Sequence, residues 1–162
     1  MLDIPPELAG LLNDLGYLWP EVDETKLLEL GQQWLALGDT LHAIEQQADA
    51  AVRTAVADNT GAAMDAFQAR WNSDKSAAKV LDKAAAGTPV VGAALFICAG
   101  VVLALKINVI IQLTILLMEI IEAIATAPET FGGSLLEIPV FKKLTDMAVN
   151  LIINEALGAI LG

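Results

Sequence analysis

The chain has only one cysteine, one histidine and one tyrosine among its 162 residues. The single Cys98 excludes an internal disulfide and a cysteine-based metal site. It stands in an apolar run, so we expect a buried thiol that packs as a small hydrophobic side chain. Because His42 has no second histidine and no nearby serine or reactive cysteine, no Ser/His/Asp or Cys/His arrangement is expected. Glu119 and Glu122 share a helix face but lack the Glu-x-x-His partners of a di-metal site. We therefore expect no enzyme, no metal and no cofactor.

Basic residues are also scarce, with 9 Lys and Arg against 20 Asp and Glu and a net charge of −11. Residues 1–60 hold eleven acidic side chains against Lys26 and Arg53, a net charge of −9. Such a chain repels phosphate backbones and anionic membrane surfaces, so nucleic-acid binding is not expected. The N-terminus lacks a basic region followed by an apolar run, and so lacks the usual secretory signal.

Period-two alternation of convincing length is missing, and aromatic content is only 5% within a hydrophobic content of 56%. We predict an all-α fold: a long antiparallel helical hairpin with a short N-terminal helix and additional apolar helices packed on it as a bundle. The expected organisation is a single helical domain, 1–162. Its expected parts are a short helix and link (1–20), the hairpin (23–86), a long apolar helix (89–127) and a C-terminal helix (139–161).

The first arm of the hairpin carries a heptad seam typical of a coiled coil. Its members alternate in steps of three and four: Leu27, Leu30, Trp34, Leu37, Leu41, Ile44, Ala48, Ala51 and Ala55. Gly31 and Gly38 lie one heptad apart within this arm. They indicate either close approach of another helix or mere tolerance of glycine.

Turn residues at Asp58-Asn59-Thr60-Gly61 separate the two arms. The second arm is expected from about Thr60 to Ala86, with Asp74 interrupting its seam. Gly87 then ends it, and Thr88-Pro89 restarts the next helix.

Residues 90–105 are sixteen uncharged residues, fewer than the roughly 20 that a membrane-spanning helix needs. Polar residues then follow in a narrow stripe, which predicts a mostly buried helix with one wet edge. The stripe consists of Asn108, Gln112, Glu119, Glu122 and Thr126. Insertion of residues 90–118 as a transmembrane span or hairpin is the alternative, although it would bury Lys106, Asn108 and Gln112.

The second arm begins Thr60-Gly61-Ala62-Ala63-Met64-Asp65-Ala66-Phe67-Gln68-Ala69-Arg70-Trp71. With the opening Leu18-Trp19-Pro20-Glu21, this hairpin resembles the WXG-type proteins exported by type VII secretion systems. It is most similar to the WXG-like N-terminal domains of actinobacterial polymorphic toxins. Gly61, Phe67 and Trp71 match the pattern, whereas Asn59 stands where the turn tryptophan would be. The tyrosine-based export signal that follows the second arm is absent, because Tyr17 is the only tyrosine.

The resemblance implies a non-enzymatic interaction and delivery domain of a type VII-secreted toxin or effector. It would dock on a small helical partner or on itself, and the partner would supply the export signal. The implied location is outside the cell or in the cell envelope, reached without a signal peptide after synthesis in the cytoplasm. The expected turn motif is Asn59, Thr60 and Gly61. The expected interface for the partner or within the hairpin comprises Trp34, Leu37, Leu41, Phe67 and Trp71.

Overall fold

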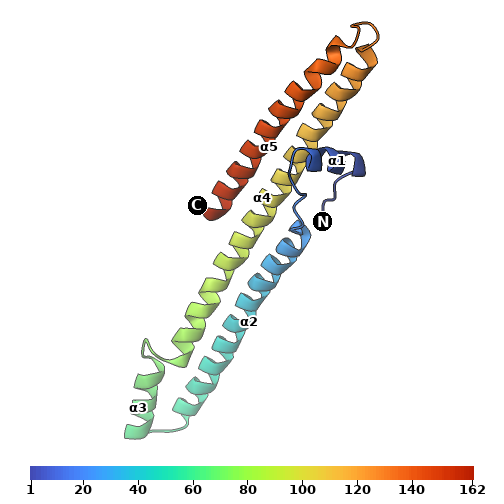
Figure 1. The fold of residues 1–162 in the computed structure, drawn as a ribbon. Helices are drawn as coiled ribbons and strands as arrows, with labels where there is room; N and C mark the ends of the chain where they lie inside the picture. Colours follow the sequence, from blue (N-terminus) through green and yellow to red (C-terminus); the bar gives the residue numbers. More distant parts are fainter. The chain divides into compact units, whose positions relative to one another are not determined.

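The computed structural model describes residues 1–162, and it is built from helices without strands. The helices are α1 (Pro6–Asp14), α2 (Glu24–Ala57), α3 (Ala62–Trp71), α4 (Ala77–Thr126), the 3-10 helix η1 (Gly133–Glu137) and α5 (Ile138–Leu161) (Figure 1). The all-α prediction is confirmed. The chain forms two compact units, which we call unit 1 (Met1–Lys26 with Cys98–Gly162) and unit 2 (Leu27–Ile97). The single-domain organisation stays a prediction.

Unit 1 combines α1, the C-terminal part of α4, and α5, which runs back beside α4 (Figure 1). Its core is a cluster of buried aliphatic side chains from the three helices: Leu8, Leu12, Val109, Leu113 and Val149. The Tyr17 hydroxyl donates a hydrogen bond to the Asp146 carboxylate at 2.8 Å. This bond fastens the segment after α1 to α5.

Unit 2 contains most of α2, all of α3 and the N-terminal part of α4. The predicted turn between the arms lies between Ala57 and Ala62, where α2 ends and α3 begins. Gly61 precedes α3 with φ +119°, a backbone conformation that strains residues with a Cβ. The Asn59 amide donates to the Ala55 carbonyl at 2.8 Å, so this side chain satisfies a free carbonyl in the last turn of α2.

The second arm is interrupted, contrary to the prediction of one helix from Thr60 to Ala86. After α3 ends at Trp71, five residues form turns before α4 begins. The Ser73 hydroxyl donates to the Arg70 carbonyl at 2.7 Å, and Ser76 accepts from the Lys79 amide at 3.2 Å. Serine side chains therefore replace backbone partners on both sides of the break, which is how serine competes with a helix.

The predicted helix end at Gly87 and restart at Pro89 are also wrong, because α4 continues through both residues. Proline has no amide hydrogen and so deprives the carbonyl four residues earlier, that of Ala85, of its usual donor. The Thr88 hydroxyl donates to this carbonyl at 2.9 Å in a buried site. A side chain thus replaces the missing backbone hydrogen bond and keeps the helix intact.

Candidate functional site

The contact between α2 and α4 in unit 2 is made at glycines. Both Gly31 and Gly38 are buried. A Cβ on Gly31 would lie 2.6 Å from the Phe96 ring, and one on Gly92 would lie 3.0 Å from the Gly31 carbonyl oxygen. A Cβ on Gly38 would overlap the Thr88 hydroxyl. The close approach suggested by the two glycines is therefore present, and its partner is α4.

This contact sets which face of α2 points outward. Of the predicted seam, Leu27, Trp34, Leu41 and Ala48 are half-buried, whereas Leu30, Leu37, Ile44, Ala51 and Ala55 are exposed. Gly31, Gly38, Glu45 and Val52 take the inner positions in their place. Successive residues of a helix are rotated by about 100°, so the exposed seam members project from the side of α2 and not toward α4. Five of the nine seam members are therefore not enclosed between α2 and α4.

We call Leu30, Leu37 and Ile44 the α2 flank. They follow one another at seven-residue intervals, with 42%, 42% and 48% of their surfaces exposed. Between residues 30 and 48 the formally charged side chains are Asp39 and Glu45. Asp39 lies about 200° around the helix from Leu37, and Glu45 takes an inner, half-buried position. The α2 flank is therefore an uncharged apolar row on an acidic helix.

Two of the three aromatic residues of the expected interface, Phe67 and Trp71, lie on α3. Phe67 is 42% exposed and stacks on Trp71 with the ring centroids 6.3 Å apart. The Trp71 indole donates to the Asp49 carboxylate at 3.2 Å, and Arg53 also donates to that carboxylate. Hydrogen bonds from Arg53 and then Trp71 lower the pKa of Asp49. This network fastens α3 to the last turns of α2.

The expected interface residues thus fall into two groups. Asp49, the anchor of Trp71, lies fifteen residues beyond Trp34, which is about 22 Å along α2. Trp34, Leu37 and Leu41 share the middle of α2, while Phe67 and Trp71 contact each other on α3. Asn59, Thr60 and Gly61 form the turn between the groups.

On the side of α2 away from the α2 flank, a shallow pocket of about 490 Å³ lies between α2 and α4. Asp39, His42 and Asp82 line it together with Gly38 and neighbouring apolar residues. The His42 ring lies 2.9 Å from the Gln46 amide nitrogen and 3.9 Å from the Glu45 carboxylate. No group of three or more histidine, cysteine, aspartate or glutamate side chains is placed to hold a metal ion.

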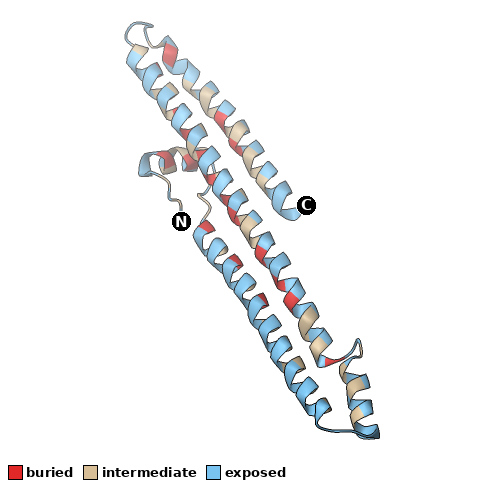
Figure 2. Cartoon of the chain, turned by 180° about the vertical axis from the view of Figure 1, so that it is seen from behind, coloured by how far each residue is buried: buried red, intermediate tan, exposed pale blue.

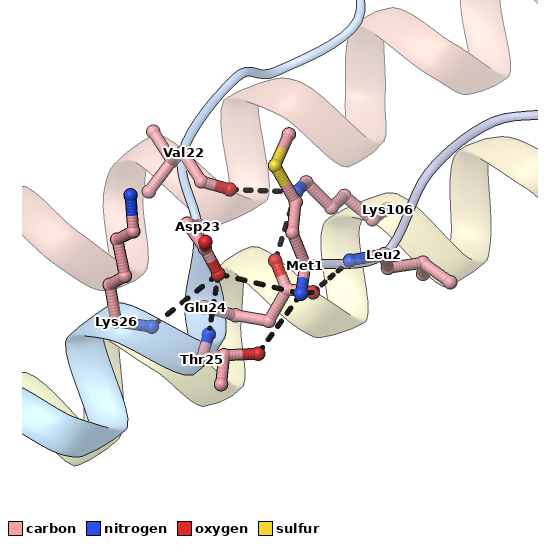
Figure 3. Close-up of polar contacts among 8 residues, drawn as sticks. All are labelled: Met1, Leu2, Val22, Asp23, Glu24, Thr25, Lys26 and Lys106. Atoms are coloured by element: carbon pink, nitrogen blue, oxygen red, sulfur yellow. Dashed lines mark hydrogen bonds and ion pairs between the residues drawn. The ribbon is translucent and has the colours of Figure 1, made fainter.

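Unit 1 contains a buried ion pair that the sequence did not predict (Figure 3). Lys106 on α4 is fully buried, and its ammonium donates to Glu24 Oε2 at 2.9 Å and to the Val22 carbonyl at 2.7 Å. The Trp19 ring centroid lies 5.7 Å from the same ammonium, within range of a cation–π contact. Hydrogen bonding from Lys106, helped by the Leu2 amide, lowers the pKa of Glu24 to about 2. A lone lysine in an apolar segment was the available signal, but its partner lies 82 residues away in sequence.

Apolar surface is also exposed along α4 and α5. Buried and exposed bands alternate along both helices (Figure 2). By length and composition α4 and the stretch Gly133–Leu161 could each cross a membrane, and only 22% and 11% of their most apolar windows is buried. The core helix of a soluble protein passes the same test, but it is mostly buried. The prediction that this apolar helix is mostly buried with one wet edge is therefore wrong.

Comparison with protein families adds independent information. The family described as WXG100 like domain matches residues 4–142, which is most of the chain. No curated protein and no solved structure matches the chain. The matched region contains the glycine-packed helices, the turn and the α2 flank. The match confirms the resemblance of the hairpin sequence to WXG-type proteins. This chain belongs to the WXG100-like domain family.

Proposed function

We propose that this chain is a helical delivery domain of a protein exported by a type VII secretion system, and that it docks on a helical partner through the α2 flank. Family membership relates the chain to the helical proteins of type VII secretion, which supports the export part of the proposal. The observation that supports docking is the uncharged row of Leu30, Leu37 and Ile44. All three are exposed on a helix whose other side is already packed on α4.

Two packed helices leave apolar side chains exposed at their flanks. A second helical pair covers such flanks by placing its own apolar side chains between them, as in a four-helix bundle. Heptad spacing on the α2 flank suits a helix as the partner. Since Tyr17 is the only tyrosine, the partner would also supply the tyrosine-based export signal.

The exported protein is proposed to be a toxin or effector whose activity is carried outside this helical domain, with the domain itself non-enzymatic. Its route would be independent of a signal peptide and would end outside the cell or in the cell envelope. Phe67 is a second proposed contact, because its ring is held outward by stacking on the anchored Trp71.

The test is co-expression with each short helical protein encoded beside the gene, in hosts with and without a functional type VII system. The wild-type chain is expected to co-purify with one of them and to be exported only when the system is present. Leu37→Glu places a charge on the α2 flank, and we expect at least a tenfold loss of co-purification and export. Gln32→Glu is the matched control, because it adds the same charge to an exposed position about 140° around α2 from Leu37.

Export without the type VII system would refute the delivery part. If Leu37→Glu binds and is exported like the wild type, the α2 flank is not the docking surface. Circular dichroism of both variants verifies that the helices remain folded.

Membrane insertion of residues 90–118 is the second candidate, and one observation favours it: the exposed apolar surface of α4. The burial of Lys106 in an ion pair with Glu24 weighs against it, because insertion would separate this pair or carry it into the bilayer. Flotation of the chain with neutral liposomes, with and without detergent, tests this candidate.

A further inference from the structure

Residues 127–137 join α4 to α5 at one end of unit 1, and we call them the α4–α5 tip (Figure 1). Within the tip Phe131 is 100% exposed, more than any other large apolar residue of the chain. Leu136, in the same segment, is 78% exposed. The Phe131 ring therefore contributes nothing to the core of its own fold.

The backbone at Phe131 indicates a role for this exposed ring. Its φ of +52° makes it the only non-glycine residue with a positive φ. The Gly132 amide donates to the Ala127 carbonyl at 2.8 Å, which closes a Schellman motif, and Phe131 takes the position that glycine usually occupies there. Phenylalanine is strained in this conformation. A residue that strains its backbone and packs on nothing in its own chain is typical of a binding residue.

Hydrogen bonds hold the loop in the shape that presents the ring. The Ser134 hydroxyl donates to the Ala123 carbonyl at 2.7 Å in a buried site, and the Ser134 amide donates to the Thr130 hydroxyl at 3.2 Å. The Thr130 hydroxyl donates in turn to the Thr126 carbonyl at 3.1 Å. Phe131 therefore projects from a fixed loop, which lowers the entropic cost of binding.

The charge around the tip has one sign. From residue 119 to residue 141 the chain carries four acidic side chains and no basic one: Glu119, Glu122, Glu129 and Glu137. None of these four carboxylates is in an ion pair. The nearest basic residues on either side, Lys106 and Lys142, are already paired with carboxylates elsewhere in unit 1. The chain therefore supplies no cation to neutralise this end of unit 1.

Three of these carboxylates, those of Glu119, Glu122 and Glu137, line one pocket of about 190 Å³. Thr126 also lines it and accepts the hydrogen bond from Thr130, so the pocket adjoins the loop. Unpaired carboxylates that share a pocket repel each other and attract a lysine or arginine side chain. Beside the apolar ring, the chain thus offers a place for a cation.

This combination favours a protein partner over a membrane. The carboxylates would be repelled by an anionic leaflet, and one aromatic ring is a small anchor for stable binding to lipid. We propose that the α4–α5 tip docks on a protein that receives the Phe131 ring in an apolar hollow bordered by lysine or arginine side chains. An aromatic anchor supplies affinity at such an interface, and complementary charge supplies specificity.

The test uses the full chain and three short fluorescent peptides. The basic–apolar peptide combines tryptophan and leucine with lysine. The acidic–apolar peptide has glutamate in place of lysine, and the basic–polar peptide has glutamine in place of tryptophan and leucine. Fluorescence anisotropy is measured at about 0.15 M salt, where a Debye length of about 8 Å screens the net charge of the chain. The basic–apolar peptide is expected to bind about tenfold more tightly than either of the others.

Two changes at the tip separate the ring from the charge. Phe131→Gly should weaken binding of the basic–apolar peptide about tenfold, because it removes the aromatic anchor. The thermal unfolding temperature of this variant should be equal or higher, since glycine adopts the positive φ without strain. Glu129→Lys/Glu137→Lys reverses the charge at the tip and should make the acidic–apolar peptide the better ligand.

Matched variants elsewhere in the chain serve as controls. Leu18→Ala removes another large apolar side chain of unit 1, which is 86% exposed. Glu21→Lys/Glu155→Lys makes the same change of charge at two exposed positions of unit 1. Both should leave the peptide preference as it is in the wild type. Leu37→Glu should also leave it unchanged, because this inference is independent of the proposed docking through the α2 flank.

Equal binding of the three peptides would overturn the inference. So would a reversal of preference in Glu21→Lys/Glu155→Lys, since the attraction would then come from the chain as a whole. A marked loss of stability in Phe131→Gly would assign the ring a structural role. Flotation with neutral liposomes that is lost in Phe131→Gly would assign the ring to lipid, and self-association lost in the same variant would assign it to another copy.

Discussion

Replacing Gly38 by alanine is expected to destabilise unit 2, although alanine is the better helix former. In an open helical position the substitution gains about 1 kcal/mol. At Gly38 the new Cβ would overlap the buried Thr88 hydroxyl, and inserting a methyl group into a packed contact costs about 1–3 kcal/mol. The overlap also pushes this hydroxyl away from the Ala85 carbonyl, which Pro89 leaves without an amide donor. An unsatisfied buried carbonyl adds about 1–3 kcal/mol.

The two costs together, about 2–6 kcal/mol, exceed the gain of about 1 kcal/mol in helix propensity, so the net loss is about 1–5 kcal/mol. Native-state hydrogen exchange read by mass spectrometry measures this locally, because peptides from α2 and from the N-terminal part of α4 report on unit 2 alone. A loss of about 2 kcal/mol corresponds to roughly 30-fold faster exchange of the amides that open with this unit.

Gly87→Ala is the matched control. Gly87 lies in the same unit inside α4, and a Cβ there meets no atom within 4 Å. This variant is expected to slow exchange, because only the propensity gain of up to about 1 kcal/mol remains. The double variant Gly38→Ala/Thr88→Ala should be less destabilised than the two single changes predict together, by about 1 kcal/mol or more, since the overlapping hydroxyl is gone. The reasoning is refuted if Gly38→Ala protects unit 2 as Gly87→Ala does, or if the two changes are simply additive.

Further predictions concern the two polar anchors. The pKa of Glu24 is lowered to about 2 in the folded chain, so its pairing with Lys106 stabilises unit 1 fully above about pH 4.5. This stability is lost as the pH falls through about 2, and acid titration of unfolding should show the loss. Lys106→Met removes one partner of the pair and should destabilise unit 1 and abolish this part of the pH dependence. Adding Glu24→Leu should recover most of the stability, which thermal unfolding of the single and double variants measures. Trp71→Phe keeps an aromatic ring beside Phe67 but loses the hydrogen bond to Asp49, costing about 1 kcal/mol. The amides of α3 should then exchange several-fold faster while those of α5 are unchanged; equal exchange in α3 would show that stacking alone holds this helix.

Heptad and 3.6-residue periodicity were sufficient to predict the all-α fold. The expected first arm (23–57) and last helix (139–161) differ from α2 and α5 by one residue at their starts. Turn residues placed the reversal before Gly61, where only a residue without a Cβ adopts the positive φ without strain. These features depend on neighbours a few residues apart, which is why the order of amino acids alone determines them.

Contacts between residues far apart in the sequence decided which helix faces are buried and where the helices continue. Apolar spacing could not show whether Leu30, Leu37 and Ile44 or the residues next to them face α4. Gly31 and Gly38 settle this, because only their face lets the two backbones approach closely. Pro89 predicts a helix break from sequence alone. In the fold the Thr88 hydroxyl replaces the missing amide donor to the Ala85 carbonyl, and the helix continues. Lys106 alone argues against burial of this segment. In the fold it pairs with Glu24, which is 82 residues away in the sequence. The amino-acid sequence thus determined that this protein consists of long apolar and amphipathic helices. Only the tertiary structure decided which faces are covered and which remain exposed, because burial depends on the atoms that a fold brings opposite each face.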